Sequence, residues 1–210
     1  FPAYLYEPCL MTVTMTPIHQ ADGAENTTWL FLPAAEGQIQ RAMTRAGIGS
    51  EDNARFYIEG NRLPKDAQWD SVIERESIFA LNRLCRVITP MKPNELEKLR
   101  AAVTLAEPET ADEIIRLAKN LDQFDFAPGV QTPAEYGKYM IQQSGRFEYD
   151  PNLDEFYDYE GYAQQHMDYS SGMFTDRGYI AYTGSVSLEE LMSDDPAEQY
   201  QREQEAGMGM

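Results

Sequence analysis

The chain has 210 residues, of which 42% are apolar and 25% are charged, a composition typical of a folded protein. Its longest apolar runs are too short to cross a bilayer, so no transmembrane helix is expected. The formal net charge of −18, from 35 Asp and Glu against 17 Lys and Arg, disfavours binding to nucleic acid or an anionic membrane and favours a basic protein surface as partner.

The first third of the chain predicts three strands and one helix. Residues 11–16 alternate Thr with larger residues, and residues 27–32 are rich in aromatic and aliphatic side chains, so both segments favour strands. Apolar residues at helical spacing predict a helix over residues 36–46, with Gly47 as its stop. Residues 54–59 predict a third strand. We therefore expect an α+β domain over residues 1–74.

The middle third predicts helices throughout. Apolar residues recur every three or four positions in four segments: residues 78–88, 92–103, 114–121 and 136–141. Two of these helices follow capping-box patterns that begin at Thr110 and Thr132, and the second also has Pro133 at its first helical position. This pattern predicts a small helical domain over residues 75–145.

The last third changes character at Arg146 and becomes rich in Tyr, Asp and Glu. It predicts a short helix over residues 156–166, two short strands at residues 172–175 and 178–182, and a short helix capped by Ser187. Residues 197–210 lack apolar periodicity and predict a frayed or extended tail. We expect residues 146–210 to form an acidic α+β domain with this tail.

Net charge is concentrated in this last domain. Residues 146–210 contain 15 acidic and three basic residues, so they carry −12 of the total charge of −18. The candidate binding residues are Glu148, Asp150, Asp154, Glu155, Asp158, Glu160, Asp168 and Asp176. General solubility accounts poorly for so uneven a distribution, since a net charge of about 2–8 suffices for a small domain.

Aromatic residues are interleaved with these carboxylates, and this favours a folded surface because acidic disordered tails are poor in aromatics. Fixed carboxylates are what imitation of DNA phosphates requires. Since B-DNA carries one charge per about 1.7 Å, 18 charges in line would match roughly 30 Å of duplex. The simpler alternative is a solvated acidic face over an aromatic core.

Residues typical of catalysis or metal binding are scarce. The sequence has no Gly-rich phosphate loop or nucleophile elbow, and residues 150–155 lack the glycine and ligand spacing of an EF-hand. Cys9 and Cys85 are too few for a disulfide scaffold, and Cys85 lies in an apolar helical pattern that predicts a buried thiol. Residues 1–16 also show no secretory signal, and the scarcity of cysteine predicts a reducing compartment, so we expect a cytoplasmic protein. Because no catalytic or metal-ligand motif is present, we expect that it is not an enzyme and has no cofactor or metal.

Four sequence stretches carry a family resemblance. They read Glu76-Ser-Ile-Phe-Ala-Leu-Asn-Arg-Leu, Asp112-Glu-Ile-Ile-Arg-Leu-Ala-Lys-Asn-Leu-Asp-Gln-Phe-Asp-Phe, Phe156-Tyr-Asp-Tyr-Glu-Gly-Tyr and Met173-Phe-Thr-Asp-Arg-Gly-Tyr-Ile. They resemble the antirestriction proteins of conjugative elements and other mobile DNA. The resemblance implies an elongated chain of three small domains, a homodimer, and a DNA mimic that inhibits type I restriction–modification enzymes by occupying their DNA-binding groove.

One other class of protein fits the charge pattern. An acidic adaptor or regulator that binds some other basic DNA-binding protein would show the same excess of carboxylates. A hydrolase is a distant third, because no catalytic constellation accompanies the two histidines.

Overall fold

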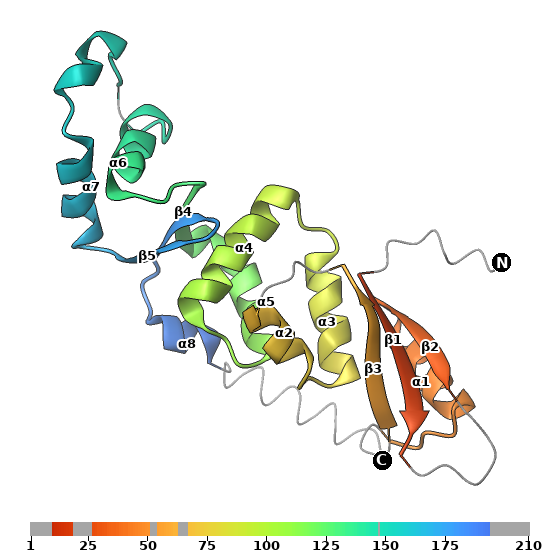
Figure 1. The fold of residues 1–210 in the computed structure, drawn as a ribbon. Helices are drawn as coiled ribbons and strands as arrows, with labels where there is room; N and C mark the ends of the chain where they lie inside the picture. The colour runs from red at the N-terminus through yellow and green to blue at the C-terminus, as the bar shows by residue number, and fades with distance from the viewer. Residues whose placement is uncertain (1–9, 19–26, 51–53, 63–66, 147, 194–210) are drawn as a thin grey trace. The chain divides into compact units, whose positions relative to one another are not determined.

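The computed structural model describes residues 10–18, 27–50, 54–62, 67–146 and 148–193 (Figure 1). These residues form a mixed α+β structure with two small antiparallel sheets, which confirms the α+β part of the expected fold class. The chain divides into two compact units: unit one has residues 1–97 and 107–118, and unit two has residues 98–106 and 119–210. The division into domains at residues 1–74, 75–145 and 146–210 stays a prediction.

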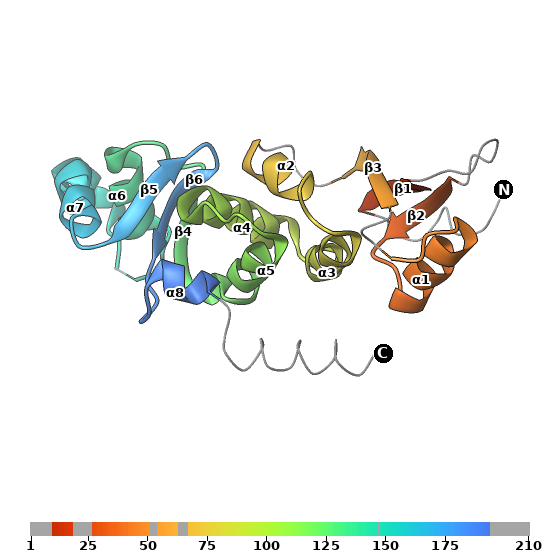
Figure 2. The same ribbon diagram turned by 90° about the horizontal axis from the view of Figure 1, so that it is seen from below.

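The sheet of unit one has the strand order β2-β1-β3 and is antiparallel. Strands β1 (Met11–Pro17), β2 (Thr28–Leu32) and β3 (Ala54–Asn61) confirm the three expected strands. Alternate residues of β1 point into the core, where Met11, Val13 and Met15 are fully buried. Helix α1 (Glu36–Arg45) packs against β2 and covers this face (Figure 2).

Four helices follow in the chain: α2 (Ala67–Ile73), α3 (Ile78–Ile88), α4 (Pro93–Ala106) and α5 (Ala111–Lys119). The last three confirm helices that apolar spacing predicts, whereas α2 is not expected from the sequence. Helix α2 nevertheless buries Trp69 completely. Cys85 is also fully buried in α3, as its place in the apolar pattern predicts.

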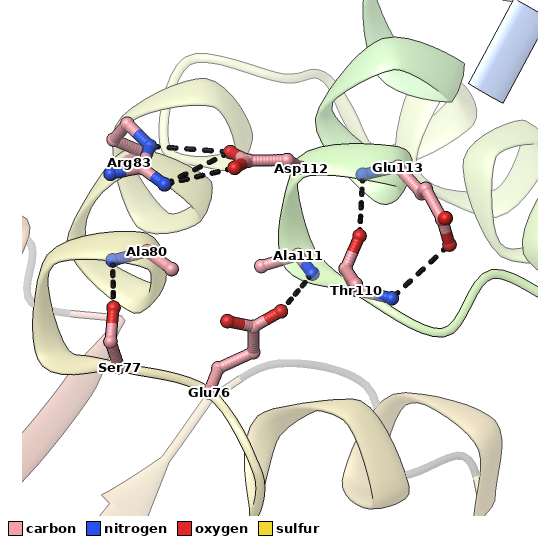
Figure 3. A network of polar contacts seen from close by, with 8 residues as sticks. All are labelled: Glu76, Ser77, Ala80, Arg83, Thr110, Ala111, Asp112 and Glu113. Carbon is pink, nitrogen blue, oxygen red and sulfur yellow. Dashed lines mark hydrogen bonds and ion pairs between the residues drawn. The ribbon is translucent and has the colours of Figure 1, made fainter. Parts of the chain in front are cut away.

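Polar contacts join the first turn of α5 to Arg83 in α3 and to Glu76, which precedes α3 (Figure 3). The Arg83 guanidinium donates to both carboxylate oxygens of Asp112, with Nη2–Oδ1 and Nη2–Oδ2 distances of 3.1 and 3.0 Å. The backbone N–H of Ala111 donates to Glu76 Oε1 at 2.5 Å. Thr110 begins α5 with the expected capping box, so two amides at the helix N-terminus have partners.

Unit two contains the second sheet, with strand order β4-β6-β5. Strands β5 (Ser171–Thr175) and β6 (Gly178–Tyr182) confirm the expected pair. The expectation that the middle third is helical throughout is wrong, because β4 (Phe124–Pro128) pairs with β6 from Phe124↔Tyr182 to Pro128↔Gly178. A short 3₁₀ turn, η3 (Leu121–Gln123), leads into β4.

Helices α6 (Pro133–Gln142) and α7 (Tyr159–Met167) lie side by side in unit two (Figures 1 and 2). They approach closely at Gly137, where a Cβ atom would come within 1.9 Å of the Tyr159 carbonyl oxygen. Helix α6 begins with the expected capping box at Thr132. Helix α7 begins three residues later than predicted, because Asp158 is its N-cap.

Two short elements flank this pair in sequence. The 3₁₀ turn η4 (Pro151–Phe156) precedes α7, and helix α8 (Leu188–Met192) follows β6 with Ser187 as the expected N-cap. Among the described residues, no helix has the length and apolar character needed to cross a bilayer. The expected tail at residues 197–210 lies outside the described residues.

Candidate functional site

The candidate carboxylates fall into one main group and one separate residue. The acidic segment, which we define as residues 148–168, runs through η4 and α7 and contains no Lys or Arg. Six of the eight carboxylates lie between Glu148 and Glu160, whereas Asp168 follows α7, a nine-residue helix about 13 Å long. Asp176 lies apart in the turn between β5 and β6, where it forms an ion pair with Arg177 (Oδ2–Nε 3.2 Å).

Asp154 is the polar centre of the acidic segment. Its Oδ1 atom accepts hydrogen bonds from the Tyr149 hydroxyl at 2.7 Å, the Tyr159 hydroxyl at 2.5 Å and Gln142 Nε2 at 2.8 Å. Gln142 ends α6, and Tyr159 begins α7. One half-buried carboxylate thus ties η4 to both helices, and we call these four residues the Asp154 network.

The Asp154 network shifts the pKa values of its members. The hydrogen bonds from Tyr159 and Tyr149 hold the pKa of Asp154 below its usual value. The bond to Asp154, followed by desolvation, raises the pKa of Tyr149 to about 12. Desolvation and then the bond to Asp154 raise the pKa of Tyr159.

These shifts define a pH window for the stability of η4. A lowered carboxyl pKa stabilises the fold above the unfolded value of about 3.9, and this stabilisation is lost as pH falls through the folded value. A raised phenol pKa stabilises the fold below about pH 10, and this stabilisation is lost as pH rises toward about 12. The Asp154 network therefore contributes its full stabilisation between about pH 4 and pH 10.

Replacing Asp154 by Asn should return the pKa of Tyr149 toward its ordinary value near 10, because the largest cause of the shift is removed. NMR titration of ring-labelled tyrosine in the wild type and in Asp154→Asn measures this directly. Glu155→Gln is the matched control, since it removes the adjacent charge and leaves the network intact. A Tyr149 that still titrates near pH 12 in Asp154→Asn would contradict the geometry.

Two further carboxylates serve as caps. Asp150 accepts from the backbone N–H of Asn152 at 2.9 Å and begins η4. Asp158 accepts from the backbone N–H of Gly161 at 3.0 Å and begins α7. Both side chains are exposed, so each fixes a backbone turn while its charge faces solvent.

Four carboxylates remain open to solvent. Within the described part of the chain, no hydrogen bond or ion pair engages the side chains of Glu148, Glu155, Glu160 and Asp168, all of which are exposed. We call these four the open carboxylates. Glu155 lies in η4, Glu160 lies in α7 and Asp168 is the C-cap of α7, whereas Glu148 precedes η4.

Sequence reasoning missed Gln142 and the donor roles of Tyr149 and Tyr159. Nothing in the pattern of α6 distinguishes Gln142 from a solvated residue, because its partners lie seven to 17 residues later. A signal for η4 did exist: Asp150 followed by Pro151 is an N-cap followed by a first-turn proline.

The acidic segment thus presents exposed carboxylates and contains no Lys or Arg of its own. The family model of the antirestriction protein (ArdA) matches residues 21–181, which is most of the chain. The chain therefore belongs to the ArdA antirestriction family. A search of curated proteins finds no match.

Proposed function

We propose that the protein is a DNA mimic that binds type I restriction–modification enzymes and blocks their DNA-binding groove. Membership of an antirestriction family supports inhibition of a restriction enzyme as its role. The observation that carries the mechanism is the acidic segment, whose carboxylates stand on a hydrogen-bonded scaffold with no Lys or Arg among them.

Charge density supports phosphate imitation. The seven carboxylates of the acidic segment carry as much charge as roughly 12 Å of B-DNA duplex. Four are the open carboxylates, and two cap helical turns with exposed side chains. We assign Asp154 a positioning role, because three donors already occupy its Oδ1 atom.

The finer features implied by family resemblance belong to the same proposal. The protein would act as a cytoplasmic homodimer of three-domain chains, encoded on a conjugative element. It would inhibit by occupancy alone, without catalysis. Pairing two copies would double the charge available to imitate a duplex that spans the groove of the enzyme.

Inhibition should weaken as salt rises from about 50 to 200 mM, because the carboxylates meet Lys and Arg side chains across partly exposed contacts that salt screens. The logarithmic slope should be shallower than that of DNA, since a protein has no condensed counterion layer of comparable density to release. Titration of a purified type I enzyme with the protein, and separately with unlabelled cognate DNA, measures both slopes. Inhibition that is independent of salt would contradict phosphate imitation.

A further inference from the structure

The turn η4 exposes an apolar ridge within the acidic segment. Leu153 and Phe156 are three residues apart in this 3₁₀ helix, where side chains at that spacing eclipse one another and share a face. Leu153 is 47% exposed and Phe156 is 81% exposed. We call this pair the Leu153–Phe156 ridge.

Contacts made by Asp154 and Tyr157, on a different side of η4 from the ridge, fix the position of this segment. Asp154 is bound by the three donors of the Asp154 network. Tyr157 is half-buried, with its ring centroid 6.0 Å from that of Tyr149 and 5.7 Å from that of Tyr159. The ridge is thus ordered before any partner arrives, which reduces the conformational entropy lost on binding.

The exposed ring of Phe156 differs from that of an exposed tyrosine. Tyr169 is exposed to a similar extent, 88%, but its hydroxyl can be solvated by water. Phe156 has no polar group, and it lies between the charges of Glu155 and Asp158. An apolar centre with a charged rim is the arrangement of an interface anchor, because the rim excludes water around the buried ring.

We propose that the Leu153–Phe156 ridge anchors the protein in an apolar recess inside the basic DNA-binding groove that the carboxylates contact. The inference rests on the proposed function and narrows the partner class. Enzymes that modify a base extrude it from the stack into a pocket lined by aromatic and apolar side chains. A flat, rigid Phe156 ring flanked by carboxylates matches an extruded base flanked by phosphates, so the partner is a base-flipping enzyme with such a pocket.

The test measures displacement of labelled cognate DNA from a purified type I methyltransferase core at several salt concentrations. Phe156→Ala should weaken binding by about tenfold or more at every salt concentration, without changing the logarithmic salt slope, because an apolar contact releases no ions. Glu155→Gln should make the slope shallower with a smaller loss of affinity. Phe156→Trp, which keeps a flat aromatic ring, should retain most of the affinity.

Two controls distinguish binding of Phe156 in an apolar recess from the effects of an exposed ring and of charge alone. Tyr169→Ala removes an equally exposed ring and should change affinity less than about threefold, since surrounding contacts are usually near neutral. Binding to an oligolysine peptide should be equal for wild type and Phe156→Ala, because that partner has charge but no recess. Equal melting temperatures for wild type and Phe156→Ala verify that the turn is intact.

The possible results distinguish a failure of the proposed anchor from a failure of the proposed function. If wild type displaces DNA and Phe156→Ala does so equally well, the ridge is no anchor, although the proposed function stands. If wild type displaces no DNA, the proposed function itself fails. If Phe156→Ala converts a dimer to a monomer in sedimentation, the ridge joins two copies of this chain and the recess is excluded.

Discussion

Neutralising the four open carboxylates together should weaken inhibition of a type I enzyme by up to about a thousandfold. The replacements are Glu148→Gln, Glu155→Gln, Glu160→Gln and Asp168→Asn. An exposed ion pair contributes about 0–1 kcal/mol, so one replacement should raise the inhibitory concentration about fivefold at most. If well-separated sites add, four replacements remove up to about 4 kcal/mol. Inhibition assays on single, double and quadruple variants measure the progression.

A matched quadruple variant controls for total charge. Asp70→Asn, Glu74→Gln, Glu107→Gln and Glu109→Gln remove the same charge from exposed positions in unit one. This variant should inhibit nearly as well as wild type, and neither quadruple variant should melt at a lower temperature, because neutralisation relieves repulsion. Loss of all inhibition from one open carboxylate alone, in a folded protein, would contradict a distributed surface.

Gly137→Ala should destabilise the protein, although alanine is normally the better helix former by about 1 kcal/mol. The new Cβ would lie 1.9 Å from the Tyr159 carbonyl oxygen and 2.6 Å from its carbonyl carbon. Helices α6 and α7 would have to separate, and overpacking of this kind costs about 1–3 kcal/mol. Because Gln142 and Tyr159 meet across the same helix pair, the Asp154 network should also loosen.

Thermal and denaturant unfolding of Gly137→Ala measure the loss, with the pKa of Tyr149 as a local probe. Gly37→Ala in α1 is the matched control, because the nearest atom to its Cβ would be the tip of the flexible Arg41 side chain at 3.4 Å. It should leave stability unchanged or slightly higher. A Gly137→Ala protein as stable as wild type, with Tyr149 still titrating near pH 12, would disprove the close approach of α6 and α7.

Local patterns predicted much of the fold. Alternation places Met11, Val13 and Met15 on one face of β1, and the capping boxes at Thr110 and Thr132 mark true helix starts. Strand β4 was not predicted, because its partner β6 begins about 50 residues later and a five-residue segment has no periodicity of its own that identifies it. Helix α2 was not predicted either, because its seven residues are too few to show a clear apolar periodicity.

The sequence predicted which residues make up the candidate site, but it did not predict which carboxylates are hydrogen-bonded and which are exposed. Counting charges locates the acidic segment, yet Asp154 and Glu155 are neighbours with opposite surroundings: one accepts three hydrogen bonds, and the other is exposed. That difference arises because η4 is a 3₁₀ helix with three residues per turn, so that neighbouring side chains point in different directions. The apolar pattern of the sequence did not indicate this helix. Gln142 joins the site only through the packing of α6 on α7.

Direct competition with DNA tests the central claim most sharply. A purified type I enzyme is first bound to labelled cognate DNA, the protein is added in increasing amounts, and the composition of each complex is determined by sedimentation. A DNA mimic should displace the DNA completely and leave a complex of enzyme and protein alone. A ternary complex that holds enzyme, DNA and this protein together would contradict occupation of the groove and favour an acidic adaptor.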